Sequence, residues 1–203
     1  MIELFELSNN HLQKTKLDFF RSLYKNIDWN SRLIGIKGAR GTGKTTMLLQ
    51  YLIQLDLPKT QKLYISLDDI YFTNHSLVEV GKAFYLQGGK ILALDEVHKY
   101  PNWSQEIKNL YDRYNDLKII FTGSSIVDIT KNEGDLSRRA VMYELKGLSF
   151  REYLDLAEDI RFNELSLEEI LDEDFVFSEL FPSDFKPYEY FNEYLKLDII
   201  LFF

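Results

Sequence analysis

The sequence of this 203-residue chain contains no cysteine. Disulfide bonds, thiolate metal sites and cysteine nucleophiles are therefore excluded. No segment approaches the roughly 20 apolar residues that a membrane-spanning helix needs. The acidic start, MIELFELSNN, lacks the basic region and apolar stretch of a secretory signal. These absences predict a cytoplasmic protein with no membrane partner.

Positive charge is also scarce, with 24 Lys and Arg against 32 Asp and Glu and a formal net charge of −8 at pH 7. Because nucleic-acid binders usually concentrate positive potential, this balance gives no support to a nucleic-acid partner. A small basic group near the start is interpreted as a solvated helix face: Lys14, Lys16, Arg21 and Lys25. The 45% apolar fraction and the length predict one main globular domain with an appendage.

Five short apolar runs alternate with helical stretches along the first part of the chain. They are Leu33–Ile36, Leu63–Leu67, Ile91–Leu94, Ile119–Phe121 and Val141–Leu145. The first four are continuous, as strands covered on both faces require, and the helices between them supply the crossovers of a parallel sheet. We therefore predict an α/β fold with a parallel five-stranded sheet sandwiched by helices.

Helix signals lie between these runs. Apolar residues occur at helical spacing in two sets, which are Leu48, Tyr51, Leu52 and Leu55, and Trp103, Ile107, Leu110 and Tyr114. Ser76 and Glu79 form the pattern of a capping box that begins another helix, and Gly88–Gly89 would end it.

The organisation of the chain changes at Gly147, which is the expected hinge. Beyond it the strand signals stop, and the patterns Ser149…Glu152 and Ser166…Glu169 predict two helix starts. We expect a helical lead-in over residues 1–30, a core domain over 31–146, and a partial helical lid over 147–203.

The segment GARGTGKT, residues 38–45, satisfies the phosphate-binding pattern G-x-x-x-x-G-K-[ST] between a predicted strand and a predicted helix. Its glycines allow a tight turn that points N–H groups at phosphate oxygens, and the helix N-terminus adds positive potential. We expect Lys44, on a solvent-facing loop, to neutralise the β and γ phosphates, and Thr45 to bind Mg²⁺. The predicted nucleotide-binding residues are Gly38, Ala39, Arg40, Gly41, Thr42, Gly43, Lys44, Thr45 and Thr46.

The run Ile91–Leu94 ends in two acids, Asp95 and Glu96. A buried strand would deliver Asp95 to the carboxyl edge of the sheet, where it can hold Mg²⁺ through its water shell. Glu96 can act as the general base that activates water. The alternative is a pair of acids in the first turn of a following helix.

Polar residues follow a further strand, and an arginine pair precedes the last one. Thr122 or Ser124 could contact the γ-phosphate or the attacking water, although an ordinary turn with hydroxyl caps fits equally well. Arg138 and Arg139 are candidates for stabilising charge on a γ-phosphate, in this chain or a neighbouring subunit; otherwise they are surface arginines. His98 is interpreted as a packing or capping residue and stays outside the catalytic set.

These segments resemble the AAA+-like ATPases of an archaeal and bacterial family that usually joins an AAA domain to a C-terminal domain of unknown function. The motifs, which cover most of residues 31–155, are GARGTGKTTMLLQ, YISLDD, ILALDEVHKYPNWSQEIKNLYD, IIFTGSS and LSRRAVMYELKGLSFREYL.

This resemblance implies roles for individual residues. Lys44 and Thr45 would contact nucleotide and Mg²⁺, and Asp95 the metal. Glu96 would be the catalytic acidic residue, with Thr122 or Ser124 in the sensor position. Arg139 would be the arginine of the LSRR motif, and Leu63–Leu67 an inserted strand.

The leading hypothesis is an ATPase that binds ATP and Mg²⁺ and couples hydrolysis to a conformational change. A homo-oligomer is compatible with this hypothesis, and its protein target is unknown. The first rival is a non-hydrolysing nucleotide switch, and Glu96 counts against it because a pure binder needs no base. A phosphotransferase lacks a recognisable acceptor site. For a GTPase, the guanine-type motif at residues 15–18 lies on the wrong side of the glycine-rich segment. The last rival is an inactive truncated fragment.

The end of the chain departs from the resembling family, whose members continue further. The segment Tyr190–Lys196 looks like the family segment that leads into a glycine-aromatic-proline turn, but residues 197–203 read LDIILFF. Under one choice of codons, a shifted reading frame would encode GYYPFF there. We therefore expect a reading-frame change at this point, with a trimmed chain as the alternative.

Overall fold

The computed structural model describes residues 1–124, 136, 138–172 and 185–196. The chain divides into two compact units, of which the first runs from Met1 to Lys146 and the second begins at Gly147. The hypothesis of a shifted frame at residues 197–203 lies outside the described residues.

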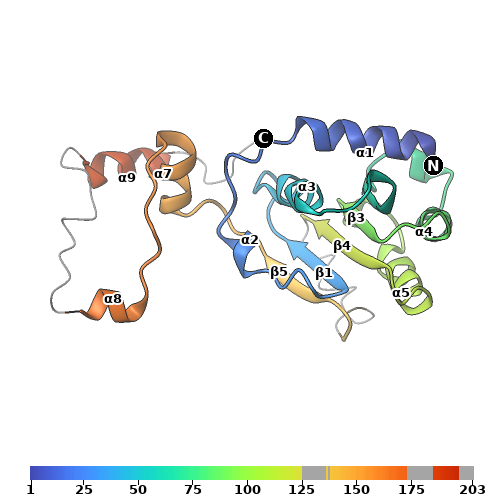
Figure 1. The fold of residues 1–203 in the computed structure, drawn as a ribbon. Helices are drawn as coiled ribbons and strands as arrows, with labels where there is room; N and C mark the ends of the chain where they lie inside the picture. Colours follow the sequence, from blue (N-terminus) through green and yellow to red (C-terminus); the bar gives the residue numbers. More distant parts are fainter. Residues whose placement is uncertain (125–135, 137, 173–184, 197–203) are drawn as a thin grey trace. The chain divides into compact units, whose positions relative to one another are not determined.

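The first unit is built on a five-stranded, all-parallel sheet in the order β2-β3-β4-β1-β5 (Figure 1). Its strands are β1 Leu33–Lys37, β2 Lys62–Ser66, β3 Ile91–Asp95, β4 Lys118–Gly123 and β5 Val141–Glu144. Each strand falls on one of the five predicted apolar runs. The predicted α/β class with a parallel sheet is confirmed.

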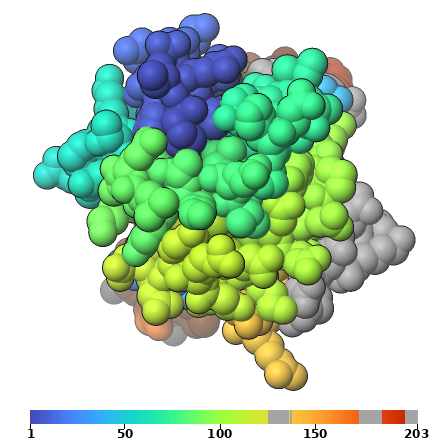
Figure 2. Space-filling model, turned by 90° about the vertical axis from the view of Figure 1, so that its right-hand side faces the viewer, coloured from blue at the N-terminus to red at the C-terminus, as the bar shows by residue number. Residues whose placement is uncertain are grey.

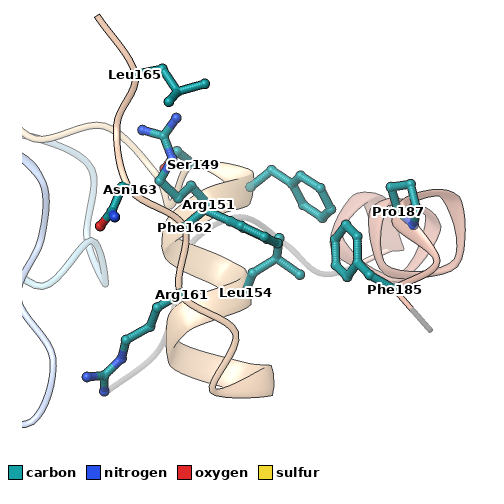
Figure 3. A pocket seen from close by; sticks show the side chains of 10 residues that line it. Ser149, Arg151, Leu154, Arg161, Phe162, Asn163, Leu165, Phe185 and Pro187 are labelled. Atoms are coloured by element: carbon teal, nitrogen blue, oxygen red, sulfur yellow. The ribbon is translucent and has the colours of Figure 1, made fainter. Parts of the chain in front are cut away.

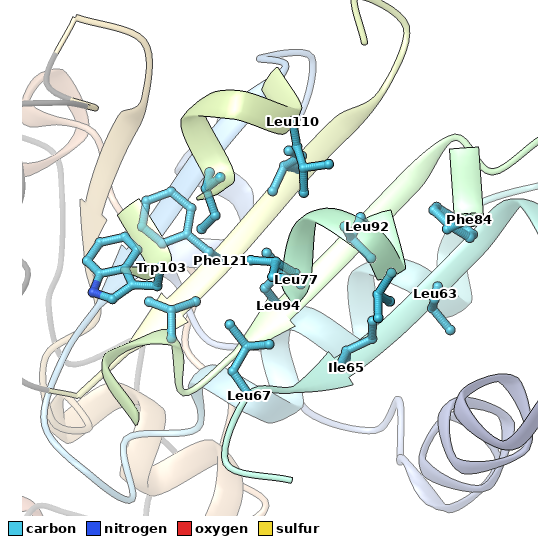
Figure 4. Close-up of a cluster of buried hydrophobic side chains, with 14 of the residues drawn as sticks. Leu63, Ile65, Leu67, Leu77, Phe84, Leu92, Leu94, Trp103, Leu110 and Phe121 are labelled. Carbon is cyan, nitrogen blue, oxygen red and sulfur yellow. The ribbon is translucent and has the colours of Figure 1, made fainter. Parts of the chain in front are cut away.

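Neighbouring residues of a strand point to opposite faces of the sheet, so a continuously apolar strand needs a helix on each face. Helices cover both faces of this sheet. Ile34 and Ile36 pack with the apolar residues of α3 (Lys44–Gln54). Leu33 belongs to the opposite core, where α4 (Leu77–Leu86) and α5 (Trp103–Arg113) cover the sheet (Figure 4). The continuous apolar runs therefore reflect two separate cores. Three short 3-10 helices connect these elements: Lys59–Gln61, Ile70–Thr73 and Val97–Lys99.

The predicted helix signals operate as expected in α4. Ser76 and Glu79 form a reciprocal capping box at its start. The helix ends at Leu86, and Gly88 then adopts a φ of 87°, in the left-handed region that glycine occupies most readily.

Helix α1 (Ile2–Lys14) lies along β2, the strand at one edge of the sheet. The backbone N–H of Tyr64 on β2 donates to the buried Ser8 hydroxyl at 3.0 Å. The ring of Phe5 approaches that of Phe84 on α4, with centroids 6.1 Å apart. Figure 2 shows the dark-blue residues of α1 directly against the green α4 region. This helix thus satisfies part of an otherwise unpaired sheet edge.

The interpretation of the basic group as one solvated helix face is wrong. α1 ends at Lys14, and the short helix α2 spans Leu23–Asn26, so Lys16 and Arg21 belong to the linker between the two. Gln50 of α3 fixes this linker by donating to the carbonyl groups of Lys16 and Phe19 at 3.1 and 2.7 Å. Arg21 is only 7% exposed.

The second unit contains α7 (Phe150–Glu158), α8 (Leu167–Leu171) and α9 (Pro187–Lys196). Capping boxes begin α7 at Ser149 and α8 at Ser166, as predicted. A cavity of about 660 Å³ lies between aromatic and aliphatic side chains of this unit (Figure 3). Across the described ranges, no helix combines the length and apolarity needed to cross a membrane.

Ser8→Ala should destabilise the first unit because it leaves the buried N–H of Tyr64 without its acceptor. We expect the free energy of unfolding to fall by about 1–3 kcal/mol, the cost of an unsatisfied buried donor. Denaturant unfolding followed by circular dichroism measures the change. Asn10→Ala, at an exposed position of the same helix, is the control, and equal effects of the two variants would contradict the role of Ser8.

Candidate functional site

Three adjacent strands bring the predicted site together at the carboxyl edge of the sheet. β1 leads into the loop of residues 38–45, β3 ends at Asp95, and β4 ends at Gly123. In the sheet, β4 lies between β3 and β1, so the three strand ends are neighbours. A pocket of about 420 Å³ opens here, and it is lined by Arg40, Gly41, Gly43, Lys44, Thr45, Thr46 and Glu96.

The loop of residues 38–45, called here the glycine-rich loop, uses its glycines for two different reasons. Gly41 and Gly43 have φ angles of 80° and 90°, which side chains strongly disfavour. At Gly38, a Cβ atom would lie 2.2 Å from the carbonyl oxygen of Leu145, just after β5. Thus two glycines shape the loop and the other allows close packing against the chain beside it.

Lys44 is buried, with 4% of its surface exposed, which corrects the expectation of a solvent-facing lysine. Its ammonium group donates to the carbonyl oxygens of Gly38 and Ala39 at 2.9 and 2.8 Å. Burial lowers the pKa of Lys44, while the carboxylates of Glu96 and Asp95 act in the opposite direction. The loop therefore wraps around its own lysine at the start of α3.

Asp95 is a buried carboxylate that accepts hydrogen bonds from hydroxyl groups of three other elements. Thr45 at the start of α3 donates to Oδ2 at 2.7 Å, and Tyr64 on β2 donates to the same oxygen at 2.9 Å. Thr122 on β4 donates to Oδ1. The predicted residues Thr45, Asp95 and Thr122 are thus brought together, and oxygen groups of this kind suit Mg²⁺.

Tyr64 is a member of this cluster that sequence reasoning missed. Burial, followed by the nearby charge of Asp95, raises the pKa of its phenol, so the hydroxyl keeps its proton. The only sequence signal is one tyrosine inside the apolar run of β2, and aromatic residues are common in buried strands.

Glu96 lies directly after β3 in the left-handed region, with φ 52°. A non-glycine residue there carries a strain of about 1–3 kcal/mol and occurs preferentially at functional sites. Its Oε2 atom accepts from the Ser124 hydroxyl at 3.2 Å and lies 3.3 Å from Nε2 of His98. Ser124 Oγ is also 3.1 Å from that nitrogen. Of the two hydroxyl candidates, Ser124 therefore lies beside the Glu96 carboxylate, and Thr122 beside Asp95.

The arginine pair lies away from this cluster. Arg139 precedes β5, whose first residue pairs with Ile34 near the start of β1, so it lies at the amino edge of the sheet. Its guanidinium forms a two-point ion pair with Asp112 of α5, with Nε–Oδ1 and Nη2–Oδ2 distances of 2.9 and 3.1 Å. Arg138 is exposed. The chain does not bring either arginine to its own glycine-rich loop.

A glycine-rich loop between a strand and a helix of a parallel sheet defines the class of P-loop NTPases. The sequence pattern of the AAA domain family matches residues 30–154, and the chain belongs to that family, whose members bind nucleotides. The resemblance drawn from the motifs is thereby confirmed.

A curated relative matches most of the chain. The uncharacterized protein MJ1637 of Methanocaldococcus jannaschii is 31% identical over 222 positions, covering 93% of this chain and 46% of that protein. The chain thus spans about half the length of this relative.

Two solved structures share the fold. The S. cerevisiae Hsp104–ADP complex matches with a TM-score of 0.55 and 18% identity, over 76% of this chain and 26% of that chain. The S. cerevisiae Hsp104:casein complex in its extended conformation matches with a TM-score of 0.50 and 19% identity, over 76% and 31%. At these identities the likeness concerns the fold alone.

Tyr64→Phe removes one hydroxyl from the buried Asp95 carboxylate and changes no other atom. A hydrogen bond to a charged group contributes about 1.5–3 kcal/mol, and the free energy of unfolding should fall by that amount. Urea unfolding at pH 7 measures it. The control is Tyr188→Phe, since Tyr188 is 83% exposed. An unchanged stability in Tyr64→Phe would show that its hydroxyl does not stabilise Asp95.

Proposed function

We propose that this chain binds ATP at the glycine-rich loop and hydrolyses it to ADP and phosphate in a Mg²⁺-dependent reaction. The observation that carries the proposal is the 2.7 Å hydrogen bond between Thr45 and Asp95, with Glu96 lining the same pocket. The residues that we propose as metal-binding hydroxyl, metal-binding carboxylate and base therefore lie around the glycine-rich loop.

The loop supplies the phosphate contacts in this proposal. Its N–H groups and the start of α3 provide positive potential. Lys44 already lies within the loop, and phosphate oxygens would replace the carbonyl groups of Gly38 and Ala39 as partners of its ammonium group. Adenine is favoured by the AAA family and by the ADP in the Hsp104 complex of similar fold.

The residues present fit Mg²⁺ better than a metal held by the protein alone. Within the described residues there is no group of three or more His, Cys, Asp or Glu side chains able to hold a metal ion. Mg²⁺ usually keeps several waters and uses one or two protein oxygens together with substrate phosphates. Thr45 and Asp95 would provide those oxygens, and the ion would supply charge stabilisation for phosphoryl transfer.

Glu96 is the proposed general base. It would accept a proton from water as the water oxygen bonds to the γ-phosphorus and the bond to the β-phosphate oxygen breaks, releasing ADP. Ser124 and His98 both contact Oε2 and would set the direction of the carboxylate. We further propose that this reaction takes place in the cytoplasm and drives a conformational change that acts on a protein target.

Glu96→Gln should retain ATP binding and lose turnover, because the amide fits the site but accepts no proton. The expected fall in kcat is about 10²–10⁴-fold, the usual contribution of a general base. Phosphate release and binding of a fluorescent ATP analogue are measured together. Lys44→Ala is the comparison variant, and it should lose binding itself while remaining folded by circular dichroism.

The outcomes of this experiment separate the hypotheses. Binding without turnover in the parent protein would favour a non-hydrolysing switch. Equal turnover in the parent and in Glu96→Gln would rule out Glu96 as the base. Unchanged ATP binding in Lys44→Ala would contradict the assignment of the glycine-rich loop.

Arg139 is proposed to act on the nucleotide of a neighbouring subunit in a homo-oligomer, since it lies at the amino edge of the sheet, opposite the glycine-rich loop of its own chain. Specific activity should then rise with protein concentration, and Arg139→Ala should lose that rise. Arg138→Ala, which alters the exposed neighbour, is the control. Specific activity independent of concentration in the parent, or an unaltered rise in Arg139→Ala, would remove the intersubunit role.

A further inference from the structure

Arg21 is a buried arginine between α1 and α2 whose guanidinium reaches the glycine-rich loop. One of its nitrogens, Nη1, donates to the carbonyl oxygen of Thr42 inside the loop. The other, Nη2, donates to the carbonyl oxygen of Lys146 at 2.8 Å, just beyond β5. Arg21 therefore contacts two carbonyl groups that lie 21 and 125 positions away from it in the sequence, through one planar group.

The carbonyl of Thr42 belongs to the same peptide group as the N–H of Gly43. Because a trans peptide is planar, its C=O and N–H bonds point in opposite directions. A guanidinium that holds the oxygen on one side therefore also directs the N–H to the other side. Gly43 lines the pocket at this loop, so the direction of its N–H matters for binding a phosphate.

This peptide group needs an external restraint. Gly43 has a φ of 90°, and glycine populates both signs of φ with similar ease, so the Thr42–Gly43 peptide can rotate at low cost. A guanidinium with two donors in a fixed plane suits the purpose, since its bond to Lys146 prevents it from moving with the loop. A lysine at the same position would carry its donors on one freely rotating nitrogen and would lack the rigid plane that aligns the two nitrogens of a guanidinium.

We propose that Arg21 is a positioning residue that locks the Thr42–Gly43 peptide with its N–H facing the phosphate pocket. The inference rests on the proposed function for its consequence in catalysis. The locked N–H would contact phosphate in the ground state and in the transition state alike. Its loss therefore raises KM for ATP and leaves kcat nearly unchanged.

A selective NMR experiment observes this peptide directly. The sequence contains only two Thr–Gly pairs, Thr42–Gly43 and Thr122–Gly123. Labelling threonine carbonyl carbons with ¹³C and glycine nitrogens with ¹⁵N leaves two amide signals in a carbonyl-edited spectrum. Gly123, at the end of β4, serves as the internal reference.

The test compares Arg21→Met and Arg21→Lys with Arg32→Met. Arg32 is the matched control, because Nη1 of its guanidinium also donates to two backbone carbonyl oxygens, those of Tyr111 and Tyr114 at 3.0 Å each. In Arg21→Met we expect the Gly43 signal to broaden or double while the Gly123 signal stays single. KM for ATP should rise roughly tenfold, the effect of losing one hydrogen bond to a charged group, with kcat within about twofold. Arg21→Lys should lie between parent and Arg21→Met.

Two results would overturn the inference. One is a single, unshifted Gly43 signal in Arg21→Met, and the other is a rise in KM that is the same in Arg21→Met and Arg32→Met. Failure of the proposed function looks different, since the parent protein itself would then show no ATP binding. In that case the Gly43 signal still reports whether Arg21 locks the peptide.

Discussion

The buried carboxylate of Asp95 imposes the tightest constraint on this structure. Removing an ionised carboxylate from water costs several kcal/mol unless hydrogen bonds replace the lost hydration. Here the replacement comes from Thr45, Tyr64 and Thr122, which belong to α3, β2 and β4. One carboxylate on β3 therefore fixes the relative positions of three other elements. The glycine-rich loop leads directly into α3, so the position of the loop depends on that helix.

The apolar and polar parts of the first unit divide the work between them. Two apolar cores on opposite faces of the sheet hold the helices and the sheet together through the packing of apolar side chains. Polar side chains gather instead at the carboxyl edge, where parallel strands end and helices begin. Arg21 and Arg32 act over longer distances in the sequence, because each donates to backbone carbonyl groups at least 21 positions away. Local turns are thereby fixed by distant residues.

Whether a feature could be predicted from the sequence depends on how far apart in the chain its determining residues lie. The strands, the capping boxes at Ser76 and Ser149 and the glycine-rich loop depend on residues close together in the chain, and all could be predicted. Tyr64 and Arg21 could not, because their importance comes from partners 21 to 125 positions away. The amino-edge position of Arg139 likewise follows from strand register rather than from its motif. The roles of the site residues in catalysis remain predictions.

The position of α1 along β2 has a consequence for the behaviour of the protein at high concentration. An uncovered edge strand presents free N–H and C=O groups that another chain can extend into a larger sheet. Ser8 occupies one of these N–H groups, and the helix covers the strand beside it. A helix cannot serve as the next strand, so sheet growth stops there. We therefore expect α1 to disfavour aggregation of copies of the chain through pairing at β2.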